Sequence, residues 1–331
     1  MTPGLGPLVV GTNRPAARFY AGGAQIDAFR SLPRGQDHTP EDWVGSMTPV
    51  RGQAPAGLTT LPDGNLLMEA IRNSPVEWLG AEHVARWGAD SMILVKLLDA
   101  GQRLPVHAHP DDAFAATMLA SAHGKAEAWF ILEPGVVYLG LREDIDRAEL
   151  AQLVRHQDTS KLLGLLNEVP VAKNDAVAVP PGTLHAIGRS VLLTEVQQPS
   201  DLSILLEWEG FAIDGEAEGH LGLGFERALA AVNTRATGPR QIEDLVRRSA
   251  LEGPVFPAFA DTWFRLDRVT SSADYSPGFA VIIATEGSSR LISTAGTLNL
   301  SKGETTVLPA ASGPVTVETA GSVLVARPPA A

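Results

Sequence analysis

The sequence predicts a mainly β protein made of two jelly-roll barrels, with short helical insertions between and around them. Two observations support this fold class. Short apolar runs bounded by Gly and Pro recur along the chain, as in Ala126–Leu132, Val136–Leu141 and Ala176–Val179, and this alternation of strands and turns is typical of a jelly roll. In addition, Lys302–Ala310 repeats the pattern of Lys173–Pro181, which predicts a second β unit of the same kind.

We therefore divide the 331 residues into three parts, since this length allows two domains of roughly 150 residues each. Residues 1–210 are predicted to form the first barrel, with a helical insert near residues 143–169. Residues 211–252 are predicted to be a helical connector, and residues 253–331 a second barrel. Histidine does not occur in residues 253–331, so the second barrel is expected to lack metal ligands.

Composition argues against several kinds of partner and site. Hydrophobic residues make up 44% of the chain and the mean hydropathy is +0.05, as in globular proteins. The net charge of −12 disfavours nucleic acids and anionic membranes as partners. The chain has no cysteine, which excludes disulfides and thiolate ligands. With no signal-peptide pattern and no apolar run of the ~18 residues that a membrane helix needs, we expect a cytoplasmic protein. The sequence does not predict an oligomeric state.

One apolar segment carries an unexpected charge. Ser91–Ala100 predicts a buried strand, and Lys96 lies in its middle. A buried lysine without partners is unfavourable, so Lys96 either extends to solvent or faces a polar cavity. Within Glu41–Ser46, Trp43 and Ser46 either line a pocket or pack beneath a loop.

Helices are predicted by apolar spacing and by end signals. Leu66–Asn73 and Pro75–Trp87 flank Ser74, a candidate N-cap before a proline. Asp144 and Ser160 are candidate caps of the two helices in the insert. The other predicted helices are Asp111–His123, Asp146–Arg155, Ser160–Leu166, Phe225–Val232 and Ile242–Arg248.

Four potential metal ligands occur in two clusters. His107 and His109 are two residues apart, which on a strand aims both imidazoles at one face. Glu127 follows in the segment GKAEAW, and His185 ends the turn VPPGTLH. Three histidines and a carboxylate suit zinc, iron, manganese, cobalt or nickel. A His-x-His pair alone is a weak signal, and the alternative is that these are unrelated surface or core histidines, but the joint pattern indicates a metal site.

Together these motifs resemble the cupin barrel and, more specifically, class I mannose-6-phosphate isomerase in its short bacterial form. The resemblance covers most of the chain, including the strand LVKLLDA, the turn HAHPDD, the segment GKAEAW and the segment EVQQ. It implies a zinc-dependent aldose–ketose isomerase with a catalytic cupin barrel and a second cupin. Its metal ligands would be His107, His109, Glu127 and His185, although the family usually has Gln in place of His107.

The resemblance also implies roles for other residues. Lys96 and Lys125 match two active-site lysines, and Lys96 would stabilise an enediolate or shuttle a proton. A bound metal would polarise a sugar oxygen as a Lewis acid. Leu205 departs from the family, which carries at this position an arginine expected to meet substrate oxygens or phosphate. The residues expected to bind substrate are Trp43, Ser46 and Glu195.

Three functions compete on these grounds. The first is an isomerase that interconverts mannose 6-phosphate and fructose 6-phosphate, or a closely related sugar pair. The second is a metal-containing cupin that binds a sugar or sugar phosphate without catalysis, which Leu205 favours. The third is a redox cupin such as a dioxygenase. Three histidines and a glutamate suit iron in such enzymes, but the two lysines and the EVQQ segment would have no role there. Retention of both lysines and all four ligands favours the isomerase.

Overall fold

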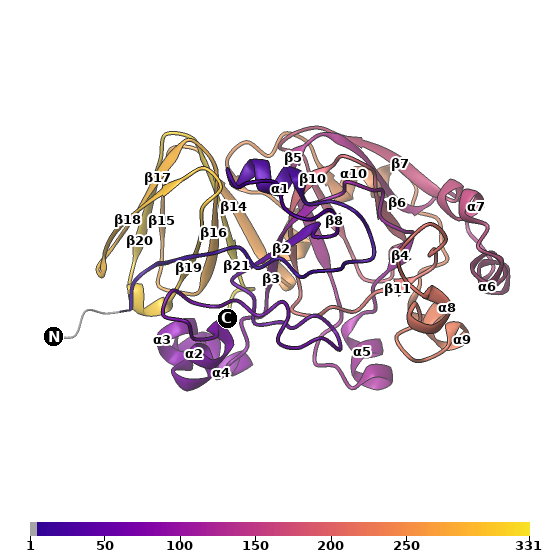
Figure 1. Ribbon diagram of the computed structural model, residues 1–331, viewed down its shortest axis with the longest axis horizontal. Helices are drawn as coiled ribbons and strands as arrows, with labels where there is room; N and C mark the ends of the chain where they lie inside the picture. The colour runs from indigo at the N-terminus through magenta and orange to yellow at the C-terminus, as the bar shows by residue number, and fades with distance from the viewer. Residues whose placement is uncertain (1–4) are drawn as a thin grey trace.

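The computed structural model describes residues 5–331 and confirms a mainly β protein. Residues 1–4, at the start of the segment without a signal-peptide pattern, lie outside the described residues. The strands form four sheets with antiparallel pairing, arranged as two pairs along the long axis of the molecule (Figure 1). Among residues 5–331, the helices are all too short or too polar to cross a membrane.

In the first pair of sheets, Lys96 lies on one sheet and His107 on the other. The Lys96 sheet has the order β12 (Val246–Arg247), β8 (Ala176–Val179), β5 (Glu127–Glu133), β10 (Leu192–Gln197), β3 (Leu94–Asp99) and β2 (Glu41–Val44). The His107 sheet has the order β11 (Ile204–Leu205), β4 (His107–Ala108), β9 (His185–Ile187), β6 (Gly135–Leu141) and β7 (Leu166–Val171). Leu98 and Trp129 from the first sheet share one apolar core with Val137 and Leu139 from the second, so the two sheets pack face to face.

The second pair of sheets contains most of the C-terminal part of the chain. One sheet has the order β1 (Leu8–Val10), β19 (Thr305–Leu308), β16 (Ala280–Glu286), β21 (Ser322–Arg327), β14 (Arg265–Val269) and β13 (Gly253–Pro254). The other has the order β15 (Ser272–Tyr275), β20 (Val315–Thr319), β17 (Ser288–Ser293) and β18 (Gly296–Ser301). Ile282, Leu291, Val317 and Val325 lie in the core between them.

The internal repeat appears as a correspondence between two sheets. The central order β8–β5–β10–β3 of the Lys96 sheet matches β19–β16–β21–β14 of the β1-containing sheet, also in relative chain order. Two strand pairings cross the predicted domain boundaries, because β1 pairs with β19, and β12, inside residues 211–252, pairs with β8. The two-barrel description and the boundaries near residues 210 and 252 stay predictions.

Alternation along β3 explains the buried lysine. Val95 and Leu97 share an apolar core with Val281 and Ile283 of the second pair of sheets. Side chains alternate between the two faces of a strand, so Lys96 points the other way, towards the His107 sheet. The strand is therefore buried on both faces, with apolar packing on one side and polar groups on the other.

The helices are short and lie around the sheets. The predicted helix Pro75–Trp87 is divided at Gly80, whose φ of 91° is unsuited to a helix interior. The caps of the two insert helices were placed wrongly, because Asp146 and Asp158 accept the N-terminal backbone hydrogen bonds instead of Asp144 and Ser160. The helices are α1 (Ala24–Phe29), α2 (Leu67–Asn73), α3 (Pro75–Leu79), α4 (Ala81–Trp87), α5 (Asp112–Leu119), α6 (Arg147–His156), α7 (Thr159–Gly164), α8 (Gly215–Glu218), α9 (Phe225–Ala228) and α10 (Pro239–Leu245), with short 3₁₀ segments at Leu229–Ala231, Ala258–Thr262 and Ala310–Ser312.

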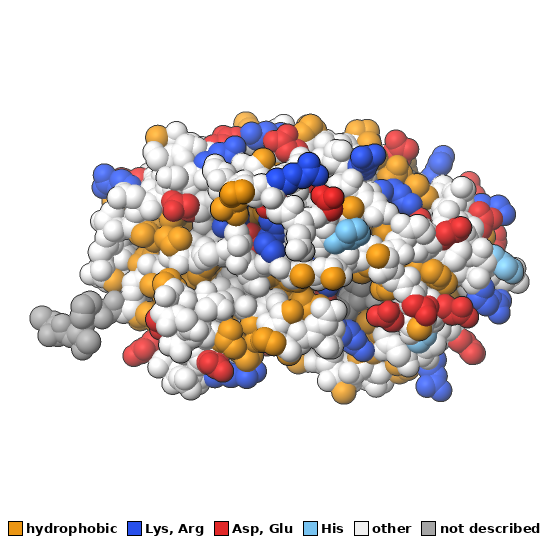
Figure 2. Space-filling view, viewed as in Figure 1, with side chains coloured by type: hydrophobic (Ala, Val, Ile, Leu, Met, Phe, Trp, Pro, Cys, Tyr) orange, Lys and Arg blue, Asp and Glu red, His pale blue; other side chains and the backbone are white. Residues whose placement is uncertain are grey.

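The surface carries both signs of charge. Figure 2 shows Lys and Arg side chains interspersed with Asp and Glu side chains over one face of the described residues. Although the chain has a net charge of −12, the acidic side chains on this face do not form one broad patch. In Figure 1, α6 and α7 project at the end of the molecule opposite β17 and β18, which leaves the first pair of sheets in the middle.

Candidate functional site

A row of polar and aromatic side chains crosses the Lys96 sheet. Trp43 on β2 lies opposite Lys96 on β3, Lys96 lies opposite Glu195 on β10, and Glu195 lies opposite Trp129 on β5. Directly opposite residues of antiparallel strands point to the same face. Glu127 precedes Trp129 by two residues and shares that face. The sheet therefore presents cationic, anionic and aromatic groups to the His107 sheet.

The facing sheet brings the predicted histidines together. His107 on β4 lies directly opposite His185 on β9, and Leu205 on β11 lies opposite His107 on its other side. The ring centroids of His107 and His185 are 4.0 Å apart, and the ring of His109 lies 5.0 Å from the first and 4.9 Å from the second. All three imidazoles are buried. One nitrogen from each forms a group within 4.8 Å, close enough to hold a single metal ion.

Hydrogen bonds fix the orientation of each imidazole. The Nδ1 atoms of His107, His109 and His185 lie 2.8, 2.7 and 2.8 Å from the backbone carbonyl oxygens of Pro105, Leu202 and Thr183, respectively. A carbonyl oxygen only accepts, so each Nδ1 carries the proton and each Nε2 carries a lone pair, which on His109 faces Lys125 Nζ. Metal-binding histidines are held in this way by their second nitrogen.

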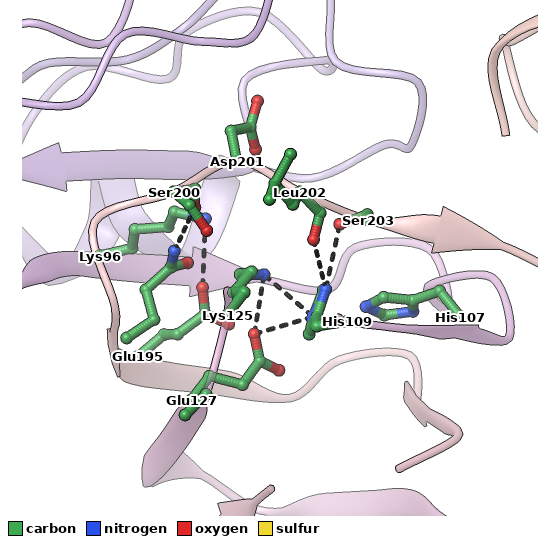
Figure 3. A network of polar contacts seen from close by, with 12 residues as sticks. Lys96, His107, His109, Lys125, Glu127, Glu195, Ser200, Asp201, Leu202 and Ser203 are labelled. Atoms are coloured by element: carbon green, nitrogen blue, oxygen red, sulfur yellow. Dashed lines mark hydrogen bonds and ion pairs between the residues drawn. The ribbon is translucent and has the colours of Figure 1, made fainter. Parts of the chain in front are cut away.

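Glu127 lies beside two of the three histidines. Its Oε2 is 3.0 Å from His109 Nε2, and its Oε1 is 3.2 Å from His185 Nε2. Lys125 Nζ lies 2.7 Å from the same Oε2 and 3.0 Å from His109 Nε2, so the three atoms form a triangle (Figure 3). Among the described residues, His185 Nε2 is buried and has no hydrogen-bond donor, and the cation beside Glu127 Oε2 is Lys125. Because a buried acceptor without a donor is unfavourable, the unpartnered His185 Nε2 beside two further imidazoles and a carboxylate fits a divalent cation.

Burial sets the protonation of these groups. It lowers the pKa of His107 well below its usual value, and together with the Lys125 ammonium it lowers the pKa of His109 to about 3. Burial alone would raise the pKa of Glu127, but Lys125 and His109 hold it well below its usual value. Neutral imidazole and ionised carboxylate are the forms that bind metals.

Lys96 lies in a second cluster of buried charges. Its Nζ is 3.1 Å from Glu195 Oε1, 3.7 Å from Glu41 Oε2 and 4.8 Å from the ring centroid of Trp43. Burial alone would lower the pKa of Lys96, but Glu195 and Glu41 raise it above its usual value. The pKa of Glu41 is in turn held below its usual value, against the effect of burial, by Arg18 and Lys96. Lys96 is therefore a permanent cation at neutral pH.

A cavity of about 400 Å³ lies between the two sheets. Its lining includes Lys96, His107, Lys125, Glu127, Glu195 and Leu205. The lysines and carboxylates enter from the Lys96 sheet and the segment preceding β5, whereas His107 and Leu205 enter from the opposite sheet. A polar ligand of sugar size would thus contact both sheets at once.

Two residues predicted to bind substrate lie away from the cavity lining. The Trp43 ring packs with Val50 and Leu94, and its Nε1 donates a 2.6 Å hydrogen bond to Glu41 Oε2. Ser46 Oγ donates to the backbone oxygen of Thr48 at 3.0 Å and closes a local turn. Both side chains are fully buried and absent from the cavity lining, so nothing in the structure supports their substrate-binding roles, which stay predictions.

Sequence reasoning missed several residues that do line the cavity. Arg18, Glu41, Arg51 and Asp201 all lie on it. Arg18 Nε contacts Glu41 Oε1 at 3.0 Å, and Arg51 N donates to Asp201 Oδ2 at 3.1 Å. Asp201 follows the EVQQ segment closely enough to have been a candidate. Arg51 carries no comparable signal, because only the tertiary fold brings it to Asp201.

No family model matches the sequence. The chain is nevertheless similar to mannose-6-phosphate isomerase ManA of Bacillus subtilis, with 30% identity over 237 residues that cover 68% of this chain and 71% of the relative. It is 32% identical over 153 residues to mannose-6-phosphate isomerase of Streptococcus mutans, covering 44% of this chain and 46% of that relative, less than half of its length.

The fold agrees with these sequence relatives. The crystal structure of mannose 6-phosphate isomerase from Bacillus subtilis superposes with a TM-score of 0.73 and 22% identity, over 98% of this chain and 100% of that one. A variant of phosphomannose isomerase from Salmonella typhimurium gives a TM-score of 0.76 at 17% identity, over 98% of this chain and 100% of that one. Since the 30% identity extends over 71% of ManA, this chain belongs to the class I mannose-6-phosphate isomerase family, as an isomerase-like enzyme.

Proposed function

We propose that this protein is a metal-dependent aldose–ketose isomerase that interconverts mannose 6-phosphate and fructose 6-phosphate, or a closely related sugar pair. The observation that carries the proposal is the convergence of three imidazoles whose Nδ1 atoms are each held by a carbonyl oxygen. The names of the relatives support the choice of sugar. We also propose that the enzyme works in the cytoplasm.

Zinc is the metal that we propose for the site. His107, His109 and His185 would hold it, with Glu127 as a fourth ligand beside the second and third histidines. Nitrogen and carboxylate donors in a buried group of this size suit zinc. When bound, the ion would supply Lewis acidity towards the oxygens on C1 and C2 of the sugar.

The reaction needs no second substrate. The hydrogen on C2 of the aldose leaves as a proton, a proton is returned to C1, and the hydroxyl proton moves from O2 to O1 by way of an enediol. Negative charge develops on these two oxygens when the C2 proton leaves. A fixed cation beside them lowers the barrier, and Lys96, whose pKa is raised by Glu195 and Glu41, meets that requirement. The same raised pKa argues against Lys96 as the proton shuttle.

Lys125 is the residue to which we assign the proton transfer. General acid–base catalysis needs a group that changes its protonation state and reaches the reacting carbon. Lys125 lines the cavity and meets one carboxylate, Glu127 at 2.7 Å, whereas Lys96 meets two. Glu195 lines the cavity, and its Oε1 lies 3.1 Å from Lys96 Nζ. Its carboxylate would accept hydrogen bonds from sugar hydroxyls.

A sugar-binding protein without catalysis is the second candidate. The observation in its favour is Leu205. This residue lines the cavity on the same sheet as His107, with which it is paired across strands β11 and β4. An apolar side chain there offers no hydrogen bond to a sugar or phosphate oxygen. Such a protein would keep the metal site and the cavity but would not need Lys125 to exchange protons.

Turnover by the zinc-loaded protein separates the two candidates. The assay measures interconversion of mannose 6-phosphate and fructose 6-phosphate, and of free mannose and fructose, together with metal content. We expect one bound ion per chain and turnover of at least one sugar pair. Full metal occupancy with sugar binding but without interconversion would refute the isomerase and support the binding protein.

A further inference from the structure

We propose that Arg51 binds the anionic group of the substrate, at the rim of the cavity. This inference rests on the proposed function, since it assigns the part of the site that recognises a sugar phosphate. Leu205 leaves the wall beside His107 apolar, so a phosphate group must find a cation elsewhere on the cavity lining.

Four cations line the cavity, and three of them are already paired. Lys96 lies 3.1 Å from Glu195, Lys125 lies 2.7 Å from Glu127, and Arg18 lies 3.0 Å from Glu41. Lys96 and Lys125 are buried and Arg18 is half-buried, and each lies beside a carboxylate whose negative charge offsets its own. A phosphate that approached them would also meet these carboxylates, so they are poor candidates for its binding.

Arg51 differs from the other three in its surroundings. Among residues 5–331, no carboxylate oxygen lies within 4.0 Å of its guanidinium. The side chain is exposed, and Nη2 donates a 3.2 Å hydrogen bond to the backbone oxygen of Leu221. The other guanidinium N–H groups have no partner in the described residues, and a planar guanidinium matches phosphate oxygens well.

Asp201 holds the backbone of Arg51 at the rim. Its Oδ2 accepts from Arg51 N at 3.1 Å, and its Oδ1 lies 3.8 Å from Arg18 Nη2. The neighbouring Ser200 donates to Gly124 O at 2.5 Å, next to Lys125 (Figure 3). Asp201 is therefore a positioning residue, which ties the rim to the segment that carries Lys125.

The charges on the cavity lining determine how a sugar phosphate would be oriented in the cavity. Asp201 and Glu218 also line the cavity, so an anion is stabilised only where the guanidinium of Arg51 itself reaches. The phosphate would then lie at the rim, and the carbon chain would extend inward to Lys125 and the three histidines. The chemical class that fits is a sugar phosphate, with the phosphate distant from the reacting carbons.

Calorimetric binding of mannose 6-phosphate and of mannose to the zinc-loaded protein tests this assignment. Arg51→Gln should weaken binding of the phosphorylated sugar about 10- to 100-fold, the range for a lost charge-assisted hydrogen bond. Arg51→Lys should give an intermediate loss, because it keeps the charge without the planar fork. The matched control is Arg72→Gln, at an exposed arginine on α2, which should leave the affinity for mannose 6-phosphate unchanged.

Two outcomes would overturn the inference. One is equal affinity of the wild type and Arg51→Gln for mannose 6-phosphate, and the other is wild-type affinity for that sugar no higher than for mannose. Turnover is measured separately. Binding that depends on Arg51 without isomerisation would refute the proposed function and leave the inference standing, whereas isomerisation with binding independent of Arg51 would do the reverse.

Discussion

Lys96 and Glu195 face each other across strands β3 and β10, with Nζ 3.1 Å from Oε1. Their exposed fractions are 3% and 2%. A buried ion pair contributes little net stability, because desolvation of the two charges offsets their attraction. The pair is therefore better explained by function, as a positive charge fixed at the wall of the cavity.

The first prediction concerns metal binding by the histidines. His109→Ala or His185→Ala should remove bound metal and any isomerase activity, since each removes one of the three converging nitrogens. Metal content by atomic spectroscopy measures the first effect without an activity assay. His156→Ala, at an exposed histidine on α6, is the matched control and should keep full occupancy. Full occupancy in both site variants would exclude this site.

The second prediction concerns the contact between the two ligand-bearing segments at Gly124. A Cβ atom on Gly124 would lie 2.5 Å from the backbone oxygen of Pro110 and 2.5 Å from the carbonyl carbon of Asp111. The same contact includes a 2.9 Å hydrogen bond from Lys125 N to Pro110 O. Gly124→Ala should therefore separate these segments, lower the free energy of unfolding by about 1–3 kcal/mol and weaken metal binding.

Gly164→Ala is the control for this steric argument. Gly164 ends α7, and a Cβ there would meet no atom within 4 Å. Alanine has the higher helix propensity, so this variant should be stabilised by up to about 1 kcal/mol. Chemical denaturation measures both variants. Equal effects of the two substitutions would show that the close approach at Gly124 is unimportant.

Much of the fold could be predicted from local sequence. The run Ala176–Val179 is β8 itself, because the adjacent glycine, proline and charged residues limit it on both sides. Helix ends were less predictable, since Asp144 and Asp146 are both plausible caps, and only the three-dimensional structure shows that Asp146 caps α6. Asp144 instead lies 2.6 Å from Arg235, a contact between residues far apart in the chain.

The site was predictable where its residues lie in compact motifs. His107, His109 and Lys125 belong to short segments that resemble a family, and the structure brings them to one place. Arg51 was not predictable, because its role depends on tertiary contacts with Asp201 and Leu221. That Trp43 and Ser46 are covered by neighbouring residues and do not line the cavity was not predictable either, because such tertiary packing cannot be read from the sequence.

The third prediction concerns the pH dependence of stability through His123 and Asp90. His123 Nε2 lies 2.7 Å from Asp90 Oδ2. Burial alone would lower the pKa of His123, but Asp90 raises that pKa above its usual value. Burial alone would raise the pKa of Asp90, but His123 brings that pKa below its usual value. The contribution of His123 is complete below about pH 6.5 and is lost as pH rises through the raised pKa. That of Asp90 is complete above about pH 4 and is lost on acidification.

The pair should therefore stabilise the protein most between about pH 4 and 6.5. Asp90 has a side chain that is 36% exposed, so solvent screening limits the effect to about 0.5–1 kcal/mol. A double-mutant cycle with His123→Asn and Asp90→Asn, measured by urea denaturation, should show this coupling at pH 5.5 and little of it at pH 9. Coupling of equal size at both pH values would contradict the assignment.

The last prediction concerns Lys96 and Lys125. Lys96→Met should keep the metal but lower kcat about 10²-fold or more, because the developing negative charge loses its fixed cation. It also leaves Glu195 and Glu41 without their cation, so Lys96→Met combined with Glu195→Gln should recover stability without recovering kcat. Lys125→Met should lower kcat by a similar factor and should also abolish exchange of the C2 hydrogen of the substrate with solvent, measured by NMR in D2O. Wild-type exchange in Lys125→Met would remove Lys125 from proton transfer, and wild-type kcat in both single variants would refute the catalytic roles assigned to the two lysines.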